Sequence, residues 1–471
     1  RTPTAKLAEA KLAYQPISVT GPDLPTPTLT ISNEHLFTGL EGHTLVWSLT
    51  EDGIPLQEGS VVGAQLAVGP GESSQVTLPF GIPETPRPDA EYRLDVSLTL
   101  AEATPWAEGG HLVAHAQFDI PVATPGATRV AAEDLPSVHL VDDAGSIHVT
   151  GDRFEAVVSR DTGRLTSLRY DERELLASDL MPNFWRTPND PELATPQIRL
   201  KRPEPSQPWR GVGEAWAVDE VDVRPMPGAA RITVRGTVTT KVPFRPSNQV
   251  TTSPQSIVYT IYGNGQVDVL STFAPVTGTP NPQVIGTMLG LRKELGTIHW
   301  YGRGPLESTA DRRSSAFFGR YFGTVADQVT HYSRPQDSGN KADTRWAAVV
   351  DDDGAGVLFI AGGSMFFNAQ PNSPDELADR RHWHEVPTSN RTVVRVDAAQ
   401  EGMQGGNWDV MTRPDKYSNT PAKGPYRHLY RILPVWAGED PGESARRFVE
   451  TELPYSPAVT PQPSPGSSAS A

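Results

Sequence analysis

Between Glu307 and Arg345 the chain gathers side chains that could do acid–base chemistry. Carboxylates alternate there with guanidinium and amide groups, at Glu307, Asp311, Arg312, Arg334, Gln336, Asn340, Asp343 and Arg345. Two carboxyl groups held close together form the catalytic pair of a glycosidase, so the cluster invites that interpretation. Mixed-charge clusters more often form salt bridges that order long loops. We predict the structural role for this cluster.

Two histidines, His382 and His384, stand in the sequence Arg-His-Trp-His-Glu and could be metal ligands. Side chains two positions apart point to opposite faces of a strand, and they do not share one face of a helix either. We therefore expect no metal site there. The chain has no cysteine, which excludes disulfides and thiolate metal sites. No phosphate-binding loop, zinc motif or Ser/His/Asp arrangement stands out.

Trp408 lies in a glycine-rich loop, with Gly402, Gly405 and Gly406 nearby. An indole held on such a loop can stack on the apolar face of a sugar ring. The commoner fate of a tryptophan is to pack beneath its own loop. The residues alone favour this second, structural role.

A second irregular segment runs from Arg186 into a proline-rich stretch, residues 191–208, that has no strand pattern. Three further polar residues stand near its start, at Asn189, Asp190 and Glu192. From the residues alone we expect a surface loop that is pinned by an Arg–Asp pair.

The elements that must hold these loops are strands. From Thr28 onward apolar and polar residues alternate with a period of two, for example in 45–49, 92–100 and 112–120. Several such strands in about 110 residues predict an immunoglobulin-like β-sandwich over residues 17–125. A short basic, alanine-rich lead-in, residues 1–16, precedes it. A linker rich in threonine, proline and alanine, residues 122–136, follows it.

A second unit, residues 137–457, continues in strands. Two tight turns separate its apolar runs, Asp161-Thr162-Gly163 and Gly263-Asn264-Gly265. Helical patterns are scarce, and we expect two or three turns in Pro374–His384 and in Glu443–Leu453. About 320 residues of strands without an internal repeat predict one large sandwich rather than a propeller. The low-complexity tail, residues 458–471, is expected to be disordered.

Composition agrees with a chain built from strands and excludes several functions. Proline accounts for 45 of 471 residues and is poorly tolerated in helices and central strands. The net charge of −15 would repel a nucleic-acid backbone or an anionic membrane. No run of about 18 apolar residues is present to span a bilayer. The first residues, Arg-Thr-Pro, carry no initiator methionine and no signal core, so we expect an internal start.

Six blocks of the sequence resemble the β-galactosidases of glycoside hydrolase family two, in that family's order. The first two are Arg1-Thr-Pro with Glu9-Ala10-Lys11, and Trp106 with Gly110-His111. The next two are residues 183–190, Asn-Phe-Trp-Arg-Thr-Pro-Asn-Asp, and residues 300–312, with Trp-Tyr-Gly-Arg-Gly-Pro, Glu307 and Asp311-Arg312. The last two are residues 332–346, with Arg-Pro-Gln and Gly-Asn, and residues 397–408, with Asp397, Gln400, Gly402, Gly405 and Trp408.

The resemblance covers residues 1 to about 436, and its departures are modest. Asp337 stands where the family usually has Glu, and Ser308-Thr309 where it has Asn-Tyr. Gly406-Asn407 precedes Trp408 where Asp-Ser is usual.

The resemblance implies an all-β chain, an immunoglobulin-like β-sandwich followed by a large galactose-mutarotase-like β-supersandwich. It identifies the chain as the carboxyl-terminal half of such an enzyme, beginning where the family's catalytic barrel ends. The family carries both catalytic glutamates on that barrel. A barrel of this kind takes about 250 residues of alternating strand and helix, which this chain does not offer. We therefore expect none of its acidic residues to be catalytic.

The resemblance also assigns roles to the two loops. Trp408 corresponds to a substrate-binding residue of the acceptor subsite. Asn189, Asp190 and Glu192 belong to a mobile loop that borders the active site. The implied activity is hydrolysis of terminal non-reducing β-D-galactosides such as lactose, with retention of configuration and with transfer of galactose to acceptors.

Cofactors, partners and location follow from the same resemblance. Mg²⁺ and Na⁺ are implied for the absent barrel, and no cofactor for this chain. The expected partners are the carbohydrate substrate and the catalytic barrel of the same enzyme, which as a whole is expected to be a cytoplasmic homo-oligomer. Neither nucleic acid nor a membrane is expected as a partner.

Two other interpretations stay open. The chain could be a separately encoded, non-catalytic small subunit or a carbohydrate-binding assembly module. It could also be an aldose mutarotase, because the family's last domain resembles that sandwich. A mutarotase needs a His/Glu acid–base pair around one sugar, whereas the sequence blocks match the hydrolase. The sequence upstream in the gene separates the first two possibilities.

Overall fold

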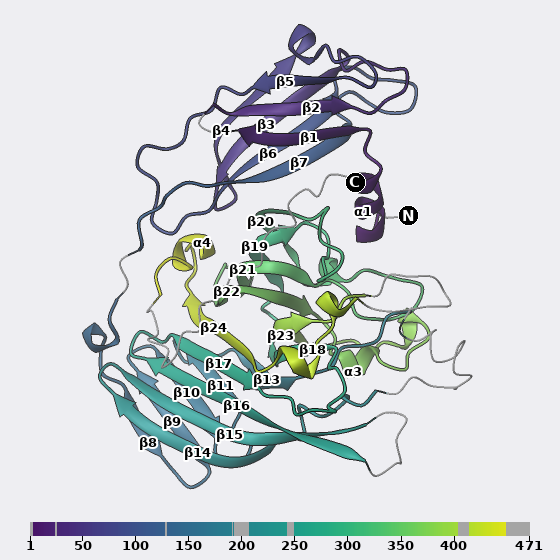
Figure 1. Cartoon of the computed structure of the whole chain (residues 1–471). Coiled ribbons are helices and arrows are strands. Elements are labelled where there is room, and N and C mark those ends of the chain that lie inside the picture. Colours follow the sequence, from purple (N-terminus) through teal and green to yellow (C-terminus); the bar gives the residue numbers. More distant parts are fainter. Residues whose placement is uncertain are drawn as a thin grey trace.

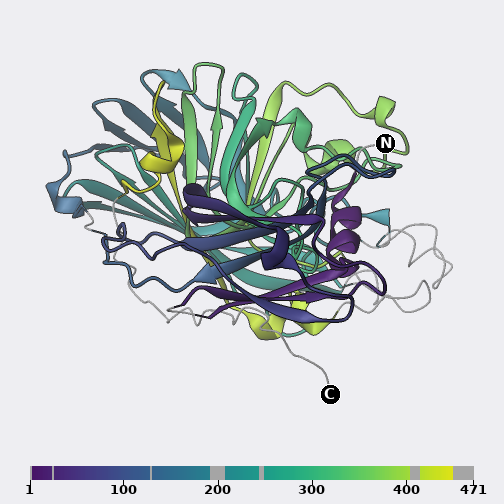
Figure 2. The same ribbon diagram turned by 90° about the horizontal axis from the view of Figure 1, so that it is seen from above.

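The computed structural model describes residues 3–23, 26–127, 130–190, 192, 207–242, 249–403 and 414–448. Figure 1 shows two bodies of β-sheet joined by a linker along one side, and Figure 2 shows the same arrangement from above. Each body has a hydrophobic core of its own, one built between Ile17 and Ile120 and the other between Ile147 and Ile432. We call them the first unit and the second unit.

The first unit is a sandwich of two antiparallel sheets, with strand orders β1–β2–β5 and β4–β3–β6–β7. Leu45, Trp47 and Leu49 of β3 are buried between the sheets, as the period of two predicts. The predicted immunoglobulin-like sandwich is therefore confirmed. The strands are β1 Ile17–Asp23, β2 Thr28–Asn33, β3 His43–Glu51, β4 Ile54–Val62, β5 Ser73–Thr77, β6 Tyr92–Leu100 and β7 Leu112–Ile120, with a 3-10 helix, η1, at Gly63–Leu66.

Helix α1, Ala5–Ala13, precedes β1 and contacts both units. Lys11 donates from Nζ to the carbonyl oxygen of Leu112 in the first unit, at 2.6 Å. Glu9 accepts a hydrogen bond at Oε1 from the backbone N–H of Ser315 in the second unit, at 3.0 Å. The lead-in helix therefore bridges the junction between the two units.

The second unit is one continuous system of strands, β8 to β24, that closes on itself. The all-β class and the large sandwich predicted from the sequence are confirmed. Its strands are β8 His139–Asp142, β9 Ser146–Gly151, β10 Phe154–Ser159, β11 Leu165–Tyr170, β12 Arg173–Glu174, β13 Leu176–Asn183, β14 Ala217–Met226, β15 Ala229–Lys241, β16 Val250–Tyr262, β17 Val267–Phe273, β18 Val284–Arg292, β19 Thr297–Gly304, β20 Phe317–Thr324, β21 Lys341–Val350, β22 Gly356–Gln370, β23 Arg391–Gln400 and β24 Tyr426–Val435.

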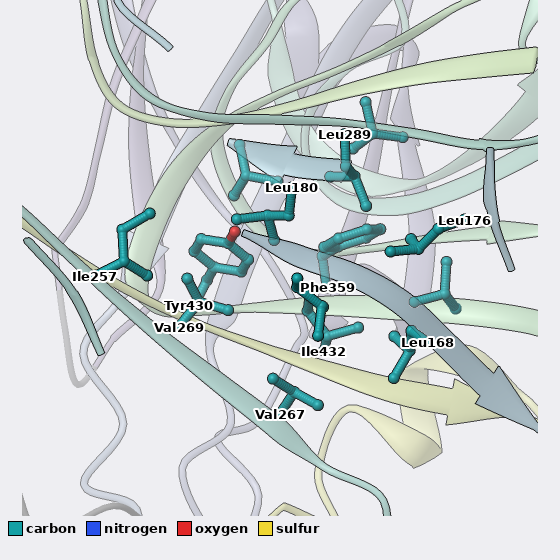
Figure 3. Close-up of a cluster of buried hydrophobic side chains, with 14 of the residues drawn as sticks. Leu168, Leu176, Leu180, Ile257, Val267, Val269, Leu289, Phe359, Tyr430 and Ile432 are labelled. Atoms are coloured by element: carbon teal, nitrogen blue, oxygen red, sulfur yellow. The ribbon is translucent and has the colours of Figure 1, made fainter. Parts of the chain in front are cut away.

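Side chains from both sides of this closed system converge on its core. Figure 3 shows Leu176, Ile257, Phe359 and other apolar residues pointing toward one another. The phenol of Tyr430 brings an oxygen into this cluster, and Thr287 Oγ1 satisfies it at 2.7 Å. Burial of this apolar surface is the main source of the second unit's stability.

The helices of the second unit are shorter than the sequence predicted. The pattern at Pro374–His384 gives only α3, Pro374–Leu377, because the backbone of Ala378 is already extended and Asp379 has a φ of +63°. The second pattern gives α4, Pro441–Ser444, which begins before Glu443 because Asp440 caps it. The part of that prediction beyond residue 448 lies outside the described residues. The remaining short helices are η2 Ala132–Asp134, η3 Ala326–Gln328, η4 Trp383–Glu385, η5 Asp415–Tyr417 and η6 Pro421–Lys423.

None of the helices in the described parts of the chain is long and apolar enough to cross a membrane.

Charged side chains join the two units. Glu91, just before β6, accepts hydrogen bonds from Arg93 Nη1 at 3.0 Å and from two groups of the second unit, Arg345 Nε at 2.8 Å and the Tyr301 hydroxyl at 2.9 Å. Burial alone would raise the pKa of Glu91, but the guanidinium groups of Arg345 and Arg93 outweigh it and hold the pKa at about 2. Glu91 is therefore an ionised hub between the units.

The first unit also covers a strand edge of the second. Gln117 of β7 donates from Nε2 to the carbonyl oxygen of Phe318 and accepts from its backbone N–H, both at 2.8 Å. Phe318 lies on β20, which pairs with β19 on its other side. A free strand edge is a template for unwanted pairing, and the Gln117 amide occupies it here.

We expect Glu91→Gln to weaken the junction between the units. A carboxyl group whose pKa falls on folding contributes stability that is present above about pH 4.5 and is lost as the pH falls toward 2. The side chain is 33% exposed and water screens it, so the expected loss at pH 7 is only about 1–2 kcal/mol in the free energy of unfolding. Urea unfolding from pH 7 down to the lowest pH that permits folding measures it. The exposed Glu102→Gln serves as control, and equal losses in the two variants would contradict the role of Glu91.

Candidate functional site

Five connections of the second unit meet below α1, on the side where β13, β19 and β23 end (Figure 1). We call residues 184–190, 305–316, 330–340, 371–386 and 401–403 the rim loops. Hydrogen bonds run directly between them. The Thr187 hydroxyl donates to the carbonyl oxygen of Pro374 at 2.8 Å, and Trp383 Nε1 donates to that of Tyr332 at 2.8 Å. Segments far apart in sequence are therefore assembled into one surface.

Arg186 is the centre of a buried charge network in the rim. Its side chain is fully buried and makes two hydrogen bonds to Glu192, Nη1 to Oε2 at 2.8 Å and Nη2 to Oε1 at 3.0 Å. Asp337 Oδ2 lies 3.9 Å from Arg186 Nε, and Asp337 Oδ1 accepts from Arg395 Nη2 at 2.6 Å. Burial opposes the charged guanidinium, but Glu192 and Asp337 outweigh it and raise the pKa of Arg186.

The residues predicted to border an active site lie together beside this network. The backbone N–H of Asn189 donates to Glu192 Oε2 at 3.0 Å, and the N–H of Glu192 donates to Asn189 Oδ1 at 3.1 Å. Asp190 joins another rim loop, because its N–H donates to Gln336 Oε1 and its Oδ2 accepts from Gln336 Nε2, at 3.1 and 3.0 Å. The prediction of a surface Arg–Asp pin was wrong: the bidentate partner of Arg186 is Glu192, and the arginine is buried.

Glu307 is a second buried carboxylate of the rim. It accepts hydrogen bonds from Arg312 Nη2 at 2.5 Å and from the backbone N–H of Gly339 at 2.8 Å, and the phenol of Tyr332 also donates to it. Gly339 has a φ of +74°, and a Cβ there would lie 2.4 Å from the carbonyl oxygen of Gln328. A carboxylate that accepts from three donors holds loops in place rather than acting as an acid or a base.

Other members of the charged cluster are paired in the same way. Asp343 accepts from Arg303 Nε at 2.6 Å and from Arg313 Nη1 at 2.7 Å. Asn340 donates from Nδ2 to the carbonyl oxygen of Ser308 at 2.7 Å. These contacts agree with the prediction that the cluster orders loops.

Asp311 fixes the point at which the chain leaves β23. Its Oδ1 accepts from the backbone N–H of Met403 at 2.9 Å. Gly402 lies so close that a Cβ there would meet Asp311 Oδ2 at 2.6 Å.

Trp408, with Gly405 and Gly406, lies outside the described residues, so its predicted role stays a prediction.

His382 and His384 do not point apart as their spacing predicted. Their rings are stacked, with centroids 5.4 Å apart and an interplanar angle of 8°. The prediction assumed a strand or a helix, whereas His382 precedes the single 3-10 turn of η4. Glu385 accepts from the backbone N–H groups of Arg381 and His382 at 2.8 and 3.3 Å. Among the described residues, no three His, Asp or Glu side chains gather as metal ligands.

Buried titratable groups beneath the rim were missed from the sequence. His428 of β24 and Asp397 of β23 are both inaccessible to solvent or nearly so. Burial lowers the pKa of His428 to about 4, and neither of its ring nitrogens has a hydrogen-bond partner. Burial likewise raises the pKa of Asp397 to about 7. The available signal was the period of two in β24, which places His428 on the same face as Tyr430 and Ile432.

Two family models match the chain. One, described as β-galactosidase small chain, matches residues 150–432, which is more than half of the chain and includes the rim loops. The chain belongs to this β-galactosidase family. The second model, described as domain 4 of β-galactosidase, matches residues 29–121, within the first unit.

Curated β-galactosidases match over both units. The chain is 31% identical to the β-galactosidase of Priestia megaterium over 427 residues, which are 89% of the chain and 39% of that protein. It is 28% identical to that of Halalkalibacterium halodurans over 412 residues, 86% of the chain and 38% of that protein. The chain therefore spans about two fifths of the length of these β-galactosidases. The solved structures that match include a galactose 1-epimerase from Lactobacillus acidophilus, with a TM-score of 0.35, 8% identity, and coverage of 64% of the chain and 99% of that protein.

Replacement of Arg186 should disrupt the rim of this β-galactosidase small-chain unit. Arg186→Met removes the guanidinium that pairs with the buried carboxylate of Glu192 and leaves Asp337 with Arg395 alone, and the loss of one partner of a buried ion pair typically costs about 3–5 kcal/mol. Arg235→Met is the matched control, because it removes an arginine from an exposed pair with Glu220 that is worth about 0–1 kcal/mol. Urea unfolding of the two variants measures the difference. Equal losses would show that the buried network does not stabilise the rim.

Acid should destabilise the small-chain unit partly through His428. A histidine whose pKa falls on folding contributes stability that is present above about pH 6.5 and is lost as the pH falls toward 4. His428→Phe should therefore flatten the loss of unfolding free energy in this range, by up to about 1.4 kcal/mol per pH unit. Unfolding curves between pH 7 and pH 4 test this, with the exposed His139→Phe as control. An unaltered slope in His428→Phe would contradict the assignment.

Proposed function

We propose that the chain is the carboxyl-terminal part of a β-galactosidase that hydrolyses terminal non-reducing β-D-galactosides such as lactose. The reaction retains configuration and includes transfer of galactose to acceptor sugars. The chain contributes loops that complete the active site, and the catalytic glutamates belong to the preceding barrel. The observation that best supports this proposal is the rim, in which buried ion pairs and hydrogen bonds between segments hold five loops together.

The state of two rim carboxylates, Glu192 and Glu307, supports the proposal that the catalytic pair lies outside this chain. A retaining hydrolase needs one carboxylate free to attack and one carboxyl free to donate a proton, about 5 Å apart. In the described part of the rim, Glu192 is held by Arg186 and Glu307 by Arg312, Gly339 and Tyr332. Neither is free to attack or to donate a proton.

The roles of the loops in the whole enzyme are part of the proposal. Trp408 forms part of the acceptor subsite by stacking on a sugar ring, and Asn189, Asp190 and Glu192 border the active site. The hydrogen bond from Asn189 Nδ2 to Met403 Sδ, 3.2 Å long, supports this grouping because it joins the loop of Asn189 to the segment that leads toward Trp408.

Cofactors and assembly are assigned in the same way. We assign Mg²⁺ and Na⁺ to the barrel, and we assign no cofactor to this chain. The barrel of the same enzyme is the chain's partner, and the whole enzyme is a homo-oligomer of the cytoplasm.

A second candidate is a separately encoded, non-catalytic small subunit that assembles with a barrel-bearing partner. The description of the matching family as a small chain favours it. The gene sequence decides between the two, because a barrel with two glutamates in the same reading frame supports one protein and a stop codon supports two. The mutarotase interpretation is weaker, because both family models that match the chain are described as β-galactosidase.

The 471-residue chain by itself should not hydrolyse β-galactosides, because positioning loops without a nucleophile form no covalent intermediate. The assay compares a pure preparation of this chain with the full-length protein on a chromogenic galactoside. We expect turnover only from the full-length protein. Turnover by the isolated chain would refute the assignment of both glutamates to the barrel.

In the full-length enzyme, Trp408→Ala should weaken the binding of glucose as acceptor by about 1–3 kcal/mol, the scale of one buried apolar side chain. Transfer should fall relative to hydrolysis, because water needs no stacking surface. The ratio of transfer to hydrolysis at rising glucose concentration measures this. A lower melting temperature with an unchanged ratio would instead place the indole beneath its own loop.

A further inference from the structure

The most exposed apolar side chains of the described chain are concentrated at one end of the first unit. Five large hydrophobic residues are at least 67% exposed, and four of them lie at this end: Tyr14 at 87%, Leu36 at 80%, Phe37 at 91% and Trp106 at 67%. Scattered exposed hydrophobic residues are ordinary, but a local concentration marks an interaction site.

Backbone contacts place these four residues at the same end. Phe37 and Trp106 lie in the connections before β3 and after β6, which are joined by the hydrogen bond from the N–H of Ala101 to the carbonyl oxygen of Gly42, at 2.9 Å. Tyr14 precedes β1, where the carbonyl oxygen of Pro16 accepts from the N–H of Glu34 at 2.8 Å. In Figure 1 this end of the first unit lies directly above α1.

Helix α1 is itself poorly covered. It has nine residues, of which only Ala5 is buried. Leu7, which is 58% exposed, and Tyr14 are seven positions apart and so lie on the same side of the helical turn. Helices of this length are marginal in water unless an apolar face packs against other structure. The exposed side of α1 is therefore open to a further contact.

We propose that this end of the first unit, together with α1, is the docking surface for the polypeptide that precedes residue 1 in the longer protein. This inference rests on the proposed function. The model that matches residues 29–121 is described as domain 4, and the relatives are more than twice as long as the part they share with this chain. In such a protein the preceding polypeptide joins the molecule at the N-terminal end of α1, and Tyr14 caps the other end of this helix.

The charges on this surface indicate what chemistry the polypeptide that covers it should have. Four exposed acidic residues, Glu34, Glu41, Glu102 and Glu108, lie in the same connections as the apolar side chains, and the neighbouring α1 carries two exposed lysines, Lys6 and Lys11. A complementary surface has an apolar centre and basic residues around it. The preceding polypeptide fits this surface because it enters the molecule at α1, which borders the surface.

Hydroxyl-radical footprinting read by mass spectrometry tests the proposal on the full-length protein and on the 471-residue chain. We expect oxidation of Tyr14, Phe37 and Trp106 to be several-fold slower in the full-length protein, at every protein concentration. Equal oxidation in the two proteins would overturn the proposal. Protection that disappears on dilution would assign the surface to a second copy and would overturn it as well.

A pair of variants tests the same surface by stability. Phe37→Asp should leave the melting temperature of the 471-residue chain unchanged, because its side chain is 91% exposed, and should lower that of the full-length protein. Phe322→Asp, on β20 and 77% exposed, is the matched control. An unchanged melting temperature of full-length Phe37→Asp would contradict docking. The full-length protein is also assayed on the chromogenic galactoside. If its surface is protected but it does not turn over the galactoside, the proposed function is refuted and the docking proposal is not.

Discussion

The rim depends on one buried cation, the guanidinium of Arg186. An arginine without solvent loses several kcal/mol of hydration, and only well-placed carboxylates compensate for that loss. Glu192 and Asp337 do so here, and Arg395 completes the series on the other side of Asp337. Because the compensation requires one geometry, the loop of Arg186 and the loop of Asp337 are fixed relative to β23. A purely apolar contact would tolerate more displacement between them.

Polar contacts with a defined geometry also fix the junction of the two units. Glu91 accepts hydrogen bonds from both sides, and Gln117 occupies the backbone edge of β20. Glu9 of α1 holds Ser315 in a rim loop whose Asp311 in turn binds the N–H of Met403. A line of polar contacts therefore runs from the lead-in helix through the rim to the end of β23. The first unit and α1 thus support the rim as well as connecting it to the rest of the protein.

The rim and the end of the first unit are two different kinds of surface. The rim is polar and cross-linked by ion pairs and hydrogen bonds, which suits loops that must keep their shape beside a sugar. The end of the first unit is apolar and unsatisfied, which suits permanent coverage by neighbouring polypeptide. The segregation of these two kinds of surface is consistent with one longer protein in which one face docks and another borders a site.

Periodicity and motif order determined much of this from the sequence alone. Alternation in β3, β6 and β7 predicts a sandwich because side chains of a strand point to opposite faces, and the motif at 183–190 marks a loop rich in polar groups. Helix length at 374–384 was overestimated, because the positive φ of Asp379 is a property of the packed chain. The stacking of His382 on His384 was missed for a similar reason, since it needs a bend that spacing does not reveal. Only the tertiary structure decided that Glu192 and Asp337 together compensate the charge of Arg186, and that Asp311 reaches Met403. Asp337 and Met403 are distant in sequence from Arg186 and Asp311 and are brought to them by the packing of the strands, and no local pattern encodes which carboxylate a buried cation will meet.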